Sequence, residues 1–138
     1  MMVKKAKVNW IEKFRLEGQT DNEKTVLMDS GENALAASPA QFLLQALAGC
    51  TMMDCVLIFT KARKHLKKFW IDVEADEMDA FPKAFTKIHL TYHIVSNDIT
   101  PEDAERAIKL SEDKYCRVHY MLSGKVELSS SFEIEPES

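Results

Sequence analysis

The sequence has no excess of basic residues. Its 138 residues include 18 lysines and arginines against 22 aspartates and glutamates, for a formal net charge of −4. A nucleic-acid-binding protein needs a basic face or an arginine-rich run to neutralise phosphates, so nucleic acid is not a predicted partner. The apolar content of 46% and the charged content of 29% are typical of a globular protein. Since no repeat or low-complexity segment appears, we expect a single domain, residues 1–138.

The sequence also lacks an export signal. The first ten residues, MMVKKAKVNW, contain lysines, but no apolar region or small-residue cleavage site follows them. We therefore predict a cytoplasmic protein. One run, Ser38 to Phe59, approaches the roughly 18 apolar residues of a membrane-spanning candidate. Because Asp54 lies inside it, and a carboxylate there costs about 2.5 to 3.5 kcal/mol on insertion scales, no membrane association is predicted.

Cysteine is scarce, and its count of three is odd. In a reducing compartment, thiols are more often buried, catalytic or metal-binding than part of a structural framework. Cys50 and Cys55 are five residues apart on a predicted helix, so the axial rise alone separates them by about 7.5 Å, beyond the roughly 7 Å limit for a bridge. Cys116 is then the only intramolecular partner open to either one. We interpret Cys55 as part of the core.

The run from Ser38 to Phe59 predicts a long central helix. Ser38 is a suitable N-cap, Pro39 fits the first helical position, and Gln41 can complete a capping box. Apolar residues then occupy every face, so the helix needs cover all round. We expect it to continue through a basic last turn as far as His65. Asp54, one turn beyond Cys50, is interpreted as a buried hydrogen-bonding group rather than a catalytic one, because a carboxylate raises the pKa of a nearby thiol.

Alternating polarity predicts strands elsewhere. Thr100, with Pro101 after it, predicts a second helix that ends near Lys114 and has Ala104, Ala107, Ile108 and Leu110 on its inner face. The predicted strands are Ala6 to Leu16, Lys24 to Met28, Phe69 to Met78, Ala84 to Val95 and Lys125 to Glu135, with a polar bend at Gly18 to Glu23 and a further helical turn at Tyr115 to Leu122. This order indicates an α+β fold with antiparallel sheets.

Two histidines lie in the strand predicted at Ala84 to Val95. His89 and His93 would converge on a helix, but on a strand they lie about 13 Å apart. They cannot share an ion, so we predict no metal site, and no cofactor is predicted either.

Two motifs resemble a known family. SPAQFLLQALAGCTMMD, followed by LSEDKYCRV, is similar to the OsmC/Ohr superfamily of small thiol-dependent proteins, and the resemblance covers most of the chain. It implies an OsmC-like fold in which antiparallel sheets surround long central helices in an intertwined homodimer. It also implies a redox protein of the oxidative stress response, of the organic hydroperoxide reductase type, that uses no cofactor. Its partners would be a hydroperoxide substrate and a dithiol reductant.

The resemblance implies roles for particular residues. Cys50 corresponds to the peroxidatic cysteine and Cys116 to the resolving cysteine. The well-studied peroxidases have a glutamate after the proline of this helix start, where this chain has Ala40, and that glutamate holds an active-site arginine. Arg15 is the candidate for this arginine, and Arg117 and His119 are further candidate cations near the thiols. The missing glutamate makes the sequence more similar to the less characterised OsmC-like branch.

An alternative function belongs to another class of protein. A non-enzymatic homodimer could bind a small apolar ligand, with incidental cysteines. The two hypotheses differ in thiol behaviour, because an enzyme needs a fast, low-pKa cysteine and a binding module does not.

Overall fold

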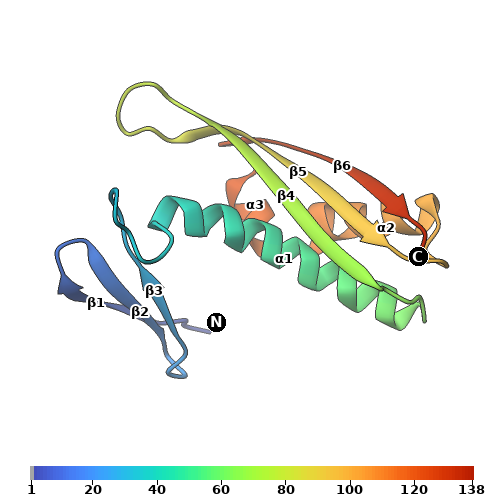
Figure 1. The fold of residues 1–138 in the computed structure, drawn as a ribbon, viewed down its shortest axis with the longest axis horizontal. Coiled ribbons are helices and arrows are strands. Elements are labelled where there is room, and N and C mark those ends of the chain that lie inside the picture. The colour runs from blue at the N-terminus through green and yellow to red at the C-terminus, as the bar shows by residue number, and fades with distance from the viewer. Residues whose placement is uncertain (1) are drawn as a thin grey trace. The chain divides into compact units, whose positions relative to one another are not determined.

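The computed structural model describes residues 2–138. The chain divides into two compact units, the first ending at Leu44 and the second beginning at Gln45. The elements follow one another as three strands, a long helix, two strands, a helical segment and a last strand, which confirms the predicted order and the α+β class (Figure 1). The single domain predicted for the whole chain stays a prediction.

The first unit contains a three-stranded antiparallel sheet. Its strands are β1 (Ala6–Glu12), β2 (Arg15–Thr20) and β3 (Thr25–Met28), in that order. The single strand predicted from Ala6 to Leu16 is wrong, because the chain turns at Lys13, whose φ is 49°, and returns as β2. All seven residues of β1 are exposed, so the alternation of polarity in that segment does not report a buried face.

Gly18 lies inside β2, where a polar bend was predicted. A Cβ at this position would come 3.2 Å from the side chains of both Val26 and Met28 on the neighbouring strand. The glycine therefore allows a close approach across the sheet rather than a turn. The turn itself comes later, between Thr20 and Thr25.

The central helix, α1 (Pro39–Lys61), starts as predicted. The Ser38 N–H donates to Gln41 Oε1 at 3.0 Å, and the Gln41 N–H donates to Ser38 Oγ at 3.2 Å, which completes the capping box. The expected continuation to His65 is wrong, because Arg63 adopts a φ of 60° and the helix has already ended.

Only one face of α1 is buried within this chain. The four buried residues follow a spacing of one helical turn, and they are Leu47, Thr51, Cys55 and Phe59. Among residues 2–138, α1 is the one helix long and apolar enough to cross a membrane by length and composition, a test that core helices also pass.

The second unit contains a mixed sheet of β4 (Lys68–Glu77), β5 (Phe85–Val95) and β6 (Glu127–Glu135). β4 and β5 are antiparallel as predicted, whereas β5 and β6 are parallel, so the prediction of antiparallel sheets is wrong for the last strand. The chain leaves β5 at Val95, passes through the helical segment and re-enters the sheet at Glu127, beside Lys87 at the opposite end, which is the crossover that a parallel pair requires. One face of β5 is buried, and it consists of Ile88, Leu90, Tyr92 and Ile94.

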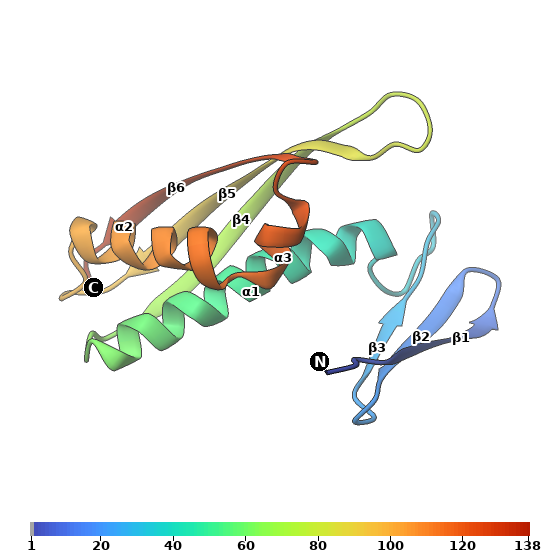
Figure 2. The same cartoon turned by 180° about the vertical axis from the view of Figure 1, so that it is seen from behind.

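The crossover contains α2 (Pro101–Leu110), a π-helical turn η1 (Ser111–Tyr115) and α3 (Arg117–Leu122). Thr100 caps α2 as predicted and forms a reciprocal capping box with Asp103. The predicted inner face is buried at Ala104, Ala107 and Ile108, whereas Leu110 is exposed because it lies at the end of the helix. Figure 2 shows α2 and α3 on the same face of the β4-β5-β6 sheet as α1. This layer of helices contains the residues from which the candidate site is built.

Candidate thiol site

The structure brings two of the three cysteines together. Cys50, half-buried on α1, is a neighbour of Cys116 and is close enough to raise the pKa of its thiol; Cys116 is 2% exposed. All three cysteines are free thiols. The pair therefore combines a partly accessible thiol with a buried one, as a peroxidatic and a resolving cysteine require. The roles assigned to them stay a prediction.

Cys116 is held between the π-turn and α3. Its N–H donates to the Ser111 carbonyl at 2.7 Å, and its Sγ accepts from the backbone N–H of His119 at 3.3 Å. The thiol thus takes the N-cap position of α3. π-helical turns are rare and are found frequently at functional sites.

The surroundings of Cys116 favour its protonated form. Burial and the neighbouring Cys50 thiol raise the pKa of Cys116 to about 12, and the backbone N–H groups of His119 and Val118 oppose this only in part. Cys116 therefore stays a thiol at neutral pH.

Cys55 is completely buried on α1, so its prediction as a core residue is confirmed. Burial is the main reason that the pKa of Cys55 is raised to about 12, and the carboxylates of Asp54 and Glu112 raise it further. Because the thiolate is the reactive form, this cysteine is inert at neutral pH.

We expect Cys55 to make the stability of the protein fall at high pH. Its folded pKa lies above the ordinary value of 9.0, so the stabilisation is complete below about pH 9 and is lost as the pH rises toward 12. The contribution of Cys55 to the slope should reach about 1.4 kcal/mol per pH unit, so the slope should be smaller by up to this amount in Cys55→Ala, as measured by urea unfolding between pH 8 and pH 11. Equal slopes for the wild-type protein and Cys55→Ala would contradict the raised pKa of Cys55.

Arg15, the predicted activating arginine, lies in the first unit. Its Nη1 contacts Glu12 Oε2 at 2.9 Å, and its Nε contacts Asp29 Oδ2 at 3.4 Å. The pKa of Asp29 is lowered, chiefly by the backbone N–H groups of Leu35 and Ser30 and also by Arg15. Arg15 is thus paired with two carboxylates of its own unit, and its role toward Cys50 stays a prediction.

The two other candidate cations differ in their relation to the thiols. Arg117 is exposed at the start of α3. His119 contacts Cys116 through its backbone N–H, and its ring Nδ1 is buried with no hydrogen-bond partner among residues 2–138. Of Arg117 and His119, it is His119 that contacts the thiol pair, through the hydrogen bond from its backbone N–H to Cys116.

A partly buried polar network surrounds the π-turn, and sequence reasoning found only one of its members. The prediction that Asp54 is a hydrogen-bonding group is confirmed, because Ser111 Oγ donates to its Oδ2 at 2.9 Å, but Asp54 is only partly buried. Glu112, the next residue of the turn, accepts from the Tyr92 hydroxyl at 3.0 Å and from Ser130 Oγ at 3.2 Å. Burial raises the pKa of Tyr92, so this phenol keeps its proton and remains a donor.

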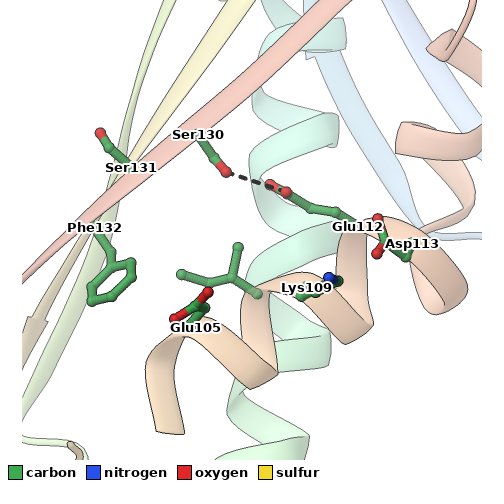
Figure 3. A pocket seen from close by; sticks show the side chains of 8 residues that line it. Glu105, Lys109, Glu112, Asp113, Ser130, Ser131 and Phe132 are labelled. Carbon is green, nitrogen blue, oxygen red and sulfur yellow. Dashed lines mark hydrogen bonds between the residues drawn. The ribbon is translucent and has the colours of Figure 1, made fainter. Parts of the chain in front are cut away.

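An open pocket of about 640 Å³ lies beside this network. Figure 3 shows the Glu112 side chain directed toward Ser130 at its edge. The residues that line it come from the helical crossover and from β6, and they are Glu105, Ile108, Lys109, Glu112, Asp113, Ser130, Ser131 and Phe132. With three carboxylates among them, the pocket is a poor match for an apolar ligand.

Among residues 2–138, no group of three histidine, cysteine or acidic side chains is arranged to hold a metal ion. His89 contacts Ser129 and Ser131, whereas His93 contacts Asp72 and Glu133. Both histidines lie on β5, as predicted.

Comparison with known proteins identifies the family. The sequence model of the OsmC-like proteins matches residues 30–131, which include both Cys50 and Cys116. The chain belongs to the OsmC-like family. The resemblance seen in the two cysteine motifs is therefore confirmed.

This OsmC-like protein is similar to Protein YhfA of Escherichia coli K12, with 30% identity over 129 residues that cover 94% of this chain and 96% of YhfA. A crystal structure from Aquifex aeolicus covers 100% of both chains with a TM-score of 0.87 and 26% identity. An organic hydroperoxide resistance protein of Bacillus subtilis covers 96% of this chain and 98% of its own, with a TM-score of 0.64 and 13% identity, and shares the fold alone. The predicted placement in the less characterised branch is confirmed.

Proposed function

We propose that this OsmC-like protein is a thiol peroxidase that reduces organic hydroperoxides through Cys50 and Cys116. The observation that supports this function is that the half-buried thiol of Cys50 neighbours the buried thiol of Cys116, whose raised pKa keeps it protonated. A thiol peroxidase needs a nucleophile that a peroxide can reach and a second thiol close enough to trap the product before it is oxidised further.

The reaction has two steps on the protein. The Cys50 thiolate attacks the terminal oxygen of the hydroperoxide, the O–O bond breaks, and the alkoxide leaves as an alcohol after taking a proton. Cys50 is then a sulfenic acid, oxidised by two electrons, and the peroxide is reduced by two. The Cys116 sulfur attacks the Cys50 sulfur, the S–O bond breaks, and the released hydroxide takes the Cys116 proton to form water. An external dithiol reduces the disulfide and restores both thiols.

The position of Ala40 bears on the rate of the first step. Without a carboxylate there, Arg15 is anchored instead by Glu12 and Asp29. We propose that Arg15 assists Cys50 in this arrangement, although less effectively than an arginine held at the helix start. The proposed location is the cytoplasm, where a reducing environment keeps three thiols free.

The active form is proposed to be a homodimer in which a second copy covers α1. This helix has no polar face, yet within one chain several of its large apolar residues remain exposed. Burying each such side chain stabilises an interface by about 1.5 to 3 kcal/mol. The exposed apolar residues of the second unit's part of α1 are Met53, Val56 and Leu57.

Turnover tests the function directly. With a dithiol as reductant, the protein should consume many equivalents of cumene hydroperoxide per chain, because each disulfide is returned to two thiols. Peroxide consumption is followed together with dithiol oxidation. Consumption at the rate of a protein-free control would contradict the proposal and would favour the alternative of a ligand-binding protein, which the acidic pocket does not otherwise support.

A further inference from the structure

Ser111 connects the two cysteine-bearing segments. It is completely buried, and its carbonyl and its hydroxyl both make hydrogen bonds. Its carbonyl accepts the N–H of Cys116 at 2.7 Å, and its hydroxyl donates to Asp54 Oδ2 at 2.9 Å. Asp54 lies one helical turn beyond Cys50 on α1. A continuous path of bonds therefore runs from Cys50 along α1 to Asp54, across to Ser111 and on to Cys116.

The π-turn that contains Ser111 is fixed on its other side as well. Glu112 receives hydrogen bonds from Tyr92 on β5 and from Ser130 on β6. A π-turn is rare and seldom formed without support from its surroundings. Here it is held by α1 through Ser111 and by the sheet through Glu112, so the position of Cys116 at its end depends on these contacts.

We propose that Asp54 and Ser111 are positioning residues whose hydrogen bond sets the separation of Cys50 and Cys116 for disulfide formation. The inference rests on the proposed function in assigning the disulfide a role in turnover. Physically, the hydrogen bond holds the second thiol at a high effective concentration next to the first.

Asp54 and Ser111 affect the second step, in which Cys116 forms the disulfide, and not the first step, in which Cys50 attacks the peroxide. Neither touches the peroxide in the first step, which depends on the access and ionisation of Cys50. Losing the hydrogen bond should slow the condensation of the sulfenic acid with Cys116. A longer-lived sulfenic acid meets more peroxide and is oxidised to sulfinic acid.

Equilibration with glutathione tests positioning without any peroxide. In this reaction Cys50 and Cys116 are oxidised to a disulfide while one glutathione disulfide is reduced to two glutathiones. Ser111→Ala and Asp54→Ala should each lower the equilibrium constant about tenfold, which raises the potential by about 30 mV for a two-electron couple. Asp54→Asn keeps an oxygen that accepts from Ser111 and should stay within about twofold of wild type.

A matched control distinguishes a positioning role from a general loss of stability. Ser96 is another buried serine of the same unit, and its hydroxyl donates to the His65 carbonyl at 2.6 Å. Ser96→Ala should reduce stability and leave the glutathione equilibrium unchanged. If Ser111→Ala does not fold, as judged by circular dichroism, Asp54→Ala and its asparagine counterpart carry the test. The proposal would be overturned if Ser111→Ala and Asp54→Ala had the wild-type equilibrium constant with glutathione, or if Ser96→Ala lowered that constant by the same factor.

Peroxide then distinguishes this inference from the function on which it rests. With excess cumene hydroperoxide, Asp54→Ala should lose its first thiol at least as fast as wild type but accumulate more sulfinic acid at Cys50, measured by mass spectrometry. A wild-type protein inert to peroxide would remove the proposed function, while the glutathione equilibria would still decide the role of Asp54 and Ser111.

Discussion

Cys50→Ser should lose its reaction with cumene hydroperoxide almost entirely, with a rate constant lower by on the order of 10³-fold or more. A serine hydroxyl stays protonated at neutral pH and cannot form the sulfenic acid on which the second step depends. The remaining thiols, Cys55 and Cys116, have pKa values raised to about 12 and do not replace it. Thiol titration against time, at a fixed excess of peroxide, gives the rate.

Two further substitutions serve as controls for this result. Cys116→Ser should react once at Cys50 and then proceed to sulfinic acid, because no thiol is left to condense with the intermediate. Cys55→Ser should behave like wild type, since Cys55 is buried and takes no part in the reaction. If Cys50→Ser reacts as fast as wild type, the enzymatic assignment is wrong, and the absence of an acidic residue at Ala40 becomes the first explanation to test.

Leu57→Glu should convert the proposed homodimer into a dissociated, largely unfolded chain. Leu57 is 53% exposed in the single chain and belongs to a helix without a polar face. In the proposed interface, an unpaired carboxylate from each copy would be desolvated, which should raise the dissociation constant by roughly a hundredfold or more. Sedimentation velocity measures the association state, and circular dichroism measures the unfolding that accompanies dissociation.

Lys109→Gln is the matched control for this substitution. It changes the charge by the same amount at an exposed position of α2 and should remain a folded dimer. A wild-type protein that sediments as a compact, stable monomer at micromolar concentration would contradict the homodimer itself.

Local chemistry explains why parts of the fold could be predicted from the sequence. The helix starts at Ser38 and Thr100 depend only on residues within one turn, and both were identified correctly. The buried face of β5 follows from alternation, because that strand packs one face on the helices and directs the other away. The cysteine motifs identified the family for the same reason, since each is a short, continuous segment.

The errors come from interactions that sequence patterns do not record. The turn at Lys13 requires a positive φ from a residue that seldom adopts one, so nothing marked the end of β1. The parallel pairing of β6 depends on where the crossover returns to the sheet. Ser111 was missed because its partner Asp54 lies 57 residues away, and a buried serine has no distinctive spacing of its own.

Peptide mapping of the wild-type protein after one equivalent of cumene hydroperoxide tests the central claim most directly. The sample is treated for minutes, alkylated under denaturing conditions and digested without reduction, and the cysteine peptides are identified by mass spectrometry. The account predicts one linked peptide pair that contains Cys50 and Cys116, with Cys55 alkylated. Three alkylated cysteines, or a disulfide that includes Cys55, would contradict it.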